Sequence, residues 1–245
     1  MKFMRNIKLL VEYDGRNYVG WQRQENGTSI QGTIESALHQ ILQESVNVIG
    51  AGRTDSGVHA RGQVANFRSE TALSVEQIRG GLNALLPEDI VIHHAENVAE
   101  DFHARYSAKS REYSYHITLE PSALLRNYAW HVKYRLDRSL MQQTASLLVG
   151  VHDFESFCKT QAEVDHHRCT VQRAYWEEQG SRLYFHITAD RFLHGMVRTL
   201  VGTMVDVGRG YTSYEDFKDI LAKKDRTEAG MAAPAHGLVL ESVIY

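Results

Sequence analysis

One glycine-rich segment of the 245-residue chain concentrates the residue types best suited to chemistry. Residues 50–60 read Gly-Ala-Gly-Arg-Thr-Asp-Ser-Gly-Val-His-Ala. Glycines allow unusual backbone angles and let a ligand approach the main chain closely. Arg53 and Asp55 are two positions apart, so an extended backbone would direct both side chains the same way. The guanidinium would keep the carboxylate ionised, as a nucleophile requires. An ordinary turn with a surface ion pair would contain the same residues.

The charges around this aspartate differ from the chain as a whole, whose net charge is −3. Between residues 50 and 68, Asp55 is the only acidic residue. Residues 102–111 contain no acid, although they include Arg105, Lys109 and Arg111. A locally basic face can therefore exist on a weakly acidic chain, and such a face is what a nucleic-acid partner needs.

Three residues outside the segment are further candidates. Tyr113 and Tyr115 share one face of a predicted strand, where either ring could stack on a planar group or simply pack in a half-buried sheet. Arg198 lies at the margin of an apolar helical stripe between Phe192 and Met204. A partly buried arginine usually has a carboxylate or phosphate partner, and we assign it Asp55. A solvated charge on a helix would give the same pattern.

No metal site is expected. Residues 165–169 read Asp-His-His-Arg-Cys, which is too crowded for the usual zinc-ligand spacing, and no second cluster completes a set of four ligands. The two cysteines, Cys158 and Cys169, form neither a CxxC pair nor a disulfide framework.

The hydrophobic spacing predicts the elements that must position these residues. In the first half it predicts a strand at 7–14, a helix opened by a Thr28/Gln31 capping box, strands near 46–50 and 63–67, a helix opened by a Ser74/Gln77 capping box, and a strand near 90–98. In the second half it predicts strands at 111–118, 170–178, 183–189 and 238–244, and helices at 138–148, at 192–207 and from Thr212.

The same order of elements occurs twice, which predicts an α+β fold of two ferredoxin-like units, similar to RNA-recognition domains, with antiparallel sheets. The expected domains are residues 1–105, carrying the aspartate loop, and residues 106–245, carrying the tyrosine strand and the arginine helix. The active-site cleft is expected between them. One larger mixed α+β domain is the alternative.

Composition points to an ordinary globular protein, with 43% hydrophobic and 23% charged residues. No run approaches the roughly 18 apolar residues of a membrane-spanning helix. The first ten residues lack the charged-then-apolar layout of a signal peptide. We therefore expect a cytoplasmic protein without a membrane partner.

The octet Arg-Thr-Asp-Ser-Gly-Val-His-Ala at residues 53–60 resembles the signature of the TruA-type tRNA pseudouridine synthases. Six further blocks resemble the family in the same order. They include Tyr-Asp-Gly-x-x-Tyr-x-Gly-Trp-Gln at 13–22, Phe-x-Ala-Arg-x-Ser-Ala at 102–108, which runs into Arg-x-Tyr-x-Tyr at 111–115, and segments at 82–90, 150–154, 192–198 and 233–238. Together the blocks extend over nearly the whole chain.

The resemblance implies conversion of uridine to pseudouridine at positions 38 to 40 of the tRNA anticodon arm, with Asp55 as the catalytic carboxylate. It favours Tyr113 over Tyr115 as the residue beside the flipped uracil, and it makes Arg198 a third catalytic residue. Arg53 is expected to contact the RNA backbone or to help displace the base. No metal or cofactor is expected, because no atoms are lost and no redox change occurs. The family also suggests a homodimer with the tRNA spanning both subunits.

Two other function classes fit part of the pattern. A non-catalytic RNA-binding module explains the repeated α+β plan, but not a single aspartate among basic residues, where it would repel phosphate. An aspartate-dependent hydrolase should bring further acids, either for magnesium or as a paired carboxylate. Three routes are compatible with Asp55 as the carboxylate: attack on the ribose C1′, attack on the base, or promotion of elimination.

Overall fold

The computed structural model describes residues 4–159 and 165–245. It divides into two compact units. The first comprises Met1–Lys109 with Leu240–Tyr245, and the second comprises Ser110–Val239. The chain thus passes from the first unit to the second and returns for its last residues. The domain boundary at residues 105 and 106 stays a prediction.

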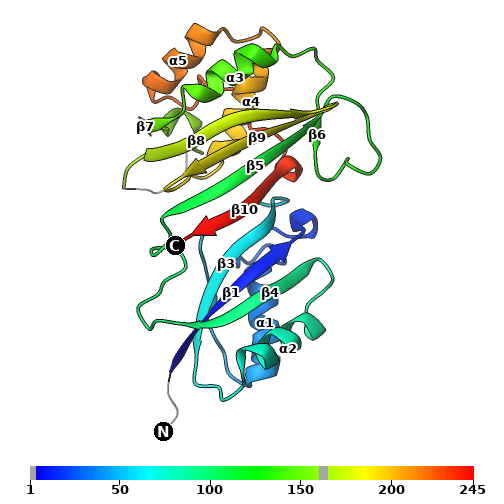
Figure 1. The fold of residues 1–245 in the computed structure, drawn as a ribbon, viewed down its shortest axis with the longest axis vertical. Helices are drawn as coiled ribbons and strands as arrows, with labels where there is room; N and C mark the ends of the chain where they lie inside the picture. Colours follow the sequence, from blue (N-terminus) through cyan, green and yellow to red (C-terminus); the bar gives the residue numbers. More distant parts are fainter. Residues whose placement is uncertain (1–3, 160–164) are drawn as a thin grey trace. The chain divides into compact units, whose positions relative to one another are not determined.

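The first unit is a βαββαβ arrangement (Figure 1). Its strands are β1 (Arg5–Tyr13), β2 (Ile49–Gly50), β3 (His59–Ser69) and β4 (Ile90–Val98), and its helices are α1 (Ile30–Leu42) and α2 (Val75–Leu85). Strand β1 lies between β4 and β3 and is antiparallel to both, while the short β2 pairs with β3. Strand β10 (Leu238–Ile244) follows β3 in the strand order. This is the strand order of a ferredoxin-like unit, as the sequence predicted.

Both faces of this sheet are covered. The alternating residues Ile7, Leu9 and Val11 of β1 are fully buried, as are Leu38 of α1 and Leu82 of α2. Figure 1 shows α1 and α2 next to each other against the sheet. The opposite face carries a smaller cluster, formed by these residues: Leu10, Ala51, Val64, Phe102, Ala104, Val243 and Tyr245.

The predicted capping boxes can be compared with the observed first residues of α1 and α2. The Ser74/Gln77 capping box of α2 is confirmed, with both reciprocal hydrogen bonds present. The Thr28/Gln31 box was wrong by one residue, because Ser29 is the N-cap of α1 and accepts from the amide of Gly32.

The second unit contains β5 (Ser110–Thr118), β6 (Trp130–His131), β7 (Gly150–Asp153), β8 (Arg168–Gln179) and β9 (Arg182–Ala189). Its sheet has the order β5-β9-β8-β7 with antiparallel pairs, and β6 adds a short parallel pairing to β5. Its helices are α3 (Arg138–Ser146), α4 (Met196–Gly208) and α5 (Tyr214–Lys223). The sequence predicted neither β6 nor β7, each only a few residues long.

Helix α4 begins at Met196, four residues later than predicted. Its N-cap is Gly195, which has a φ of 74° and so turns the chain before the helix starts. Leu193 is buried at helical spacing from Met196 but precedes that turn, which explains the early prediction. Helix α5 is likewise shifted, since its capping box is Ser213/Asp216 and not Thr212/Glu215.

The α+β class with antiparallel sheets is confirmed. Within the described residues, none of the helices is both long and apolar enough to span a membrane. The cleft expected between the two units stays a prediction.

Candidate active site

Asp55 lies on a tight loop between β2 and β3 and is half-buried. The amide of Val58 donates to the Asp55 carbonyl at 3.2 Å, and Gly57 supplies the positive φ of 78° that this turn requires. Arg53, two residues earlier, is exposed, and Thr54 between them is buried. The turn therefore fixes the backbone of Asp55. The Arg53 side chain, two residues earlier, faces solvent.

A second segment clamps this loop from the side. Gly20 forms an isolated antiparallel bridge with Asp55, and the amide of Trp21 donates to the Thr54 carbonyl at 3.1 Å. Gly20 has a φ of 115°, and a Cβ there would lie 2.5 Å from the Thr54 carbonyl oxygen. The Tyr13 and Thr54 hydroxyls are hydrogen-bonded at 2.8 Å. No side chain larger than glycine at position 20 would allow this approach.

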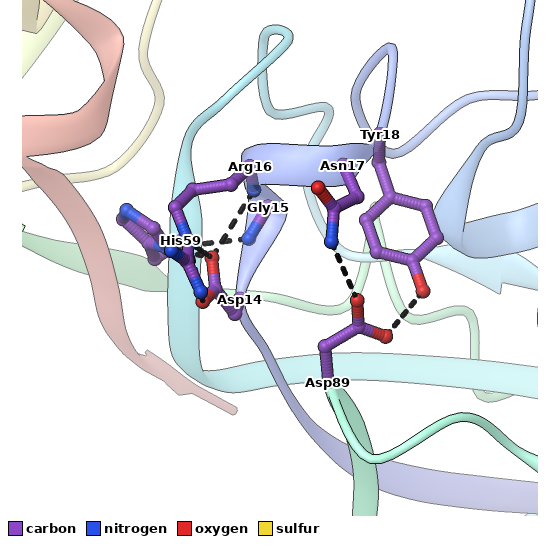
Figure 2. A network of polar contacts seen from close by, with 7 residues as sticks. All are labelled: Asp14, Gly15, Arg16, Asn17, Tyr18, His59 and Asp89. Carbon is purple, nitrogen blue, oxygen red and sulfur yellow. Dashed lines mark hydrogen bonds and ion pairs between the residues drawn. The ribbon is translucent and has the colours of Figure 1, made fainter. Parts of the chain in front are cut away.

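Figure 2 shows how the clamping segment is itself anchored. The Tyr18 hydroxyl donates to Asp89 Oδ1 at 2.5 Å, and Asn17 Nδ2 donates to Asp89 Oδ2 at 3.3 Å. The carbonyl of Tyr18 accepts a hydrogen bond from Ser56 Oγ at 3.1 Å, next to Asp55. Burial, the hydrogen bond to Asp89 and the charge of Asp89 raise the pKa of Tyr18 well above its usual value. Tyr18 therefore stays neutral and acts as a donor.

A second group of contacts in Figure 2 joins Asp14, Arg16 and His59 at the start of β3. His59 Nδ1 accepts from the Gly15 amide at 3.2 Å and lies 3.1 Å from Asp14 Oδ1. Arg16 Nε donates to the same carboxylate at 2.8 Å. Residues from three sequence blocks, 13–22, 53–60 and 82–90, thus meet around the Asp55 loop.

The two candidate tyrosines of β5 differ in their surroundings. Tyr113 is 6% exposed, and its ring meets that of Phe192 edge-on, with 5.0 Å between centroids. Tyr115 is fully buried, and its hydroxyl donates to the Pro234 carbonyl at 2.8 Å. Burial raises the pKa of Tyr115 far above its ordinary value. These contacts give Tyr115 a packing role in the core of the second unit.

Arg198 is half-buried in the first turn of α4. Its Nε donates to the Ala233 carbonyl at 2.8 Å, and the Ala233 amide donates to the Arg198 carbonyl at 2.9 Å. Burial lowers the pKa of His236, and the positive charge of Arg198 lowers it further. The two hydrogen bonds between Arg198 and Ala233 join the sequence blocks at 192–198 and 233–238. Arg198 and Asp55 belong to different units, so their pairing stays a prediction.

Among the described residues, Asp153, Glu155 and His167 form a group whose potential ligand atoms all lie within 4.8 Å of one another. Lys224 Nζ lies 3.0 Å from Asp153 Oδ2, and His167 Nδ1 lies 3.7 Å from Glu155 Oε2. Burial would raise the pKa of Asp153, but Lys224 and the Glu155 amide lower it on balance. These contacts describe an ion-pair network.

The 165–169 cluster lies in the same part of the second unit. Cys169 is buried, which raises its pKa to about 12, and its thiol donates to the His167 carbonyl. Such a thiol stays protonated near neutral pH.

The hydrogen bond between Tyr18 and Asp89 is a feature of the site that the sequence did not predict. Both lie within blocks that resemble the family, but they are 71 residues apart. No local pattern links a tyrosine before one helix to an aspartate after another. The only available signal was their position in those blocks.

Comparison with known proteins identifies the family. A family model described as tRNA pseudouridine synthase matches residues 9–107 and 144–245. The chain is 43% identical to tRNA pseudouridine synthase A 2 of Clostridium perfringens, over 99% of this chain and 100% of that protein. It is 44% identical to tRNA pseudouridine synthase A of an Exiguobacterium strain, over 99% and 98% of the two chains.

A third relative, tRNA pseudouridine synthase A of Caldicellulosiruptor saccharolyticus, is 44% identical over 99% of this chain and 100% of its own. The chain belongs to the tRNA pseudouridine synthase family and is an isomerase. The resemblance to the TruA type is confirmed.

Proposed function

We propose that this enzyme converts uridine to pseudouridine in the anticodon stem-loop of tRNA, at positions 38 to 40, with Asp55 as nucleophile. The observation that carries the proposal is the Asp55 loop. A half-buried aspartate, the only acid between residues 50 and 68, lies on a turn clamped by Gly20, Trp21 and Tyr18. Rigid support of one carboxylate is what covalent catalysis needs.

The reaction needs little besides such a carboxylate. The bond between uracil N1 and ribose C1′ breaks, the base turns, and C5 bonds to C1′. C5 then releases its proton, and N1 gains one. As nucleophile, the Asp55 carboxylate bonds to the substrate and assists the breaking of the N1–C1′ bond, and the bond to Asp55 breaks again before pseudouridine is released. The uridine must leave its stack for this step.

The other roles follow the family pattern. Tyr113 lies beside the flipped uracil, and its hydroxyl helps to remove the C5 proton; the edge-on contact with Phe192 supports a fixed ring. Arg198 pairs with Asp55, and its Nε contact to Ala233 restricts its guanidinium. Arg53, which is exposed, contacts the RNA. The enzyme acts in the cytoplasm as a homodimer.

The test uses unmodified tRNA transcripts that carry tritium at uridine C5. Wild-type enzyme should release tritium, and pseudouridine should map to positions 38 to 40. Asp55→Asn should lower the single-turnover rate by about 10⁴-fold or more with little change in tRNA affinity. Asp219→Asn, which removes the same charge from an exposed position, is the matched control and should remain active.

Three results would contradict the proposed function. An Asp55→Asn variant that retained a tenth of wild-type activity would refute its role as nucleophile. Release of free uracil or phosphate would identify a hydrolase, and tight binding without turnover would identify an RNA-binding module.

A further inference from the structure

A loop of the first unit displays a tyrosine to solvent. Tyr106 lies between β4 and β5 and is 76% exposed. Residues 102–111 around it include no acid. A single exposed aromatic side chain is ordinary on a protein surface, so the groups around Tyr106 must show whether it can bind a ligand.

The loop that carries Tyr106 is held at Ala104, which is fully buried. The Ala104 amide donates to Asn66 Oδ1 at 2.8 Å, and its carbonyl accepts from the hydroxyl of Tyr245 at 2.7 Å. One residue earlier, the His103 amide donates to Ser107 Oγ at 3.0 Å, and the Ser107 amide donates back to the His103 carbonyl at 2.9 Å. The loop is therefore anchored on both sides of Tyr106.

Two side chains complete the surface around the ring. The His103 ring lies 4.4 Å from the Tyr106 ring, tilted by 34°, and the Arg105 guanidinium carbon lies 5.5 Å from the Tyr106 centroid. His103 Nδ1 accepts from the amides of Arg105 and Tyr106, at 3.1 and 3.2 Å. Neutral His103 therefore carries its proton on Nε2 and is fixed in orientation.

An aromatic ring, an imidazole and a guanidinium are the groups on which proteins stack unpaired nucleobases, and a nearby cation also attracts the phosphates. We propose that Tyr106, with His103 and Arg105, is a stacking site for one unpaired base of the tRNA, distinct from the uridine at Asp55. This inference rests on the proposed function only in taking RNA as the substrate.

The second unit contains another exposed tyrosine, Tyr211, which serves as a control. Tyr211 is 77% exposed and also lies against an arginine, since Arg209 is 4.8 Å from its centroid. Arg209 is paired with Asp206 at 2.9 Å, so a carboxylate stands beside that ring. The carboxylate would repel a phosphate backbone. Tyr211 is therefore the control for exposure and residue type.

The first measurement is the Kd of an unmodified, fluorescein-labelled anticodon stem-loop transcript at fixed salt. Tyr106→Ala should weaken binding about 5- to 140-fold, the range expected for one stacked base. Tyr106→Phe keeps the ring and should bind close to wild type. Tyr211→Ala should change the Kd by no more than about twofold. Equal losses in Tyr106→Ala and Tyr211→Ala, or none in Tyr106→Ala, would overturn the proposal.

The second measurement locates the base. Abasic nucleotides placed one at a time in the loop should reveal one position at which Tyr106→Ala has no additional effect on the Kd. If no position shows this coupling, or if a blunt duplex without a loop loses as much affinity, Tyr106 does not stack on an unpaired base. A lower molar mass of Tyr106→Ala in solution would assign Tyr106 to a subunit contact and overturn the proposal as well.

Tritium release by the wild-type enzyme keeps the two ideas separate. Wild type without pseudouridine formation refutes the proposed function, whereas the Kd and the abasic scan decide the role of Tyr106 alone.

Discussion

Tyr18→Phe tests whether the clamp on the Asp55 loop serves the reaction. The substitution keeps a ring that is only 6% exposed and removes one hydroxyl, the donor to Asp89 at 2.5 Å. A hydrogen bond to a charged group is worth about 1.5–3 kcal/mol. Asp89 is half-buried and keeps its contact with Asn17, so we expect the lower end, about 1.5–2 kcal/mol less free energy of unfolding.

The catalytic effect should exceed what stability alone explains. The Tyr18 carbonyl holds Ser56, the neighbour of Asp55, so a shifted Tyr18 displaces the carboxylate. A displacement of about 1 Å can cost about 10²-fold in rate, and we expect a loss of about 10- to 100-fold in single-turnover rate at saturating tRNA. Because the Tyr18 side chain is buried, the Kd for tRNA should hardly change.

The assay combines urea unfolding with single-turnover tritium release between pH 6 and 9. Tyr18 has a raised pKa and stays protonated in this range, so the variant should keep the shape of the wild-type pH profile. Tyr115→Phe is the matched control, because it also removes a buried hydroxyl donor but lies in the second unit. A Tyr18→Phe variant that lost stability but kept its rate within about twofold would refute the positioning role.

Three further predictions concern the substrate and the second unit. Tyr113→Phe should bind tRNA nearly normally yet turn over about 10²–10⁴-fold more slowly, whereas equal, mild losses in Tyr113→Phe and Tyr115→Phe would remove Tyr113 from the chemistry. The logarithm of tRNA affinity should fall steeply with the logarithm of salt, by about 0.7–0.9 per phosphate contact, and a flat response would mean that the basic segments do not bind RNA. Because the folded-state pKa of His236 is lowered, the unfolded chain takes up a proton there first, so stability should decline as the pH falls below about 6.5. His236→Gln should reduce that decline in urea midpoints measured from pH 7.5 to 5, and an unchanged slope would contradict the assignment.

Much of the fold could be predicted because local signals agree with burial. The Ser74/Gln77 box and the strand at 90–98 lie where the pattern predicted them. At α1, two adjacent residues can both cap a helix, and only Ser29 has the right backbone position. At α4, hydrophobic spacing reports which residues are buried and not where helical hydrogen bonds begin, so the turn at Gly195 was missed.

Part of the candidate site could be predicted from the sequence, and part could not. The glycine-rich segment and Asp55 are contiguous in the sequence, so they could be recognised directly. The choice between Tyr113 and Tyr115 could not be made from alternation, because both lie on one face; the hydrogen bond from Tyr115 to Pro234 spans 119 residues. The clamp through Tyr18 and Asp89 likewise depends on contacts that only the folded chain makes.

The return of the chain to the first unit has a consequence for how the protein is made. Residues 240–245 belong to the first unit. There the Lys109 amide donates to the Ile244 carbonyl, and the Tyr245 hydroxyl donates to the Ala104 carbonyl. When residues 1–109 have emerged from the ribosome, the strand that completes their unit has not yet been synthesised. During synthesis the first unit therefore stays incomplete until residues 240–245 have been made, and the loop that presents Tyr106 gains its contact with Tyr245 only then.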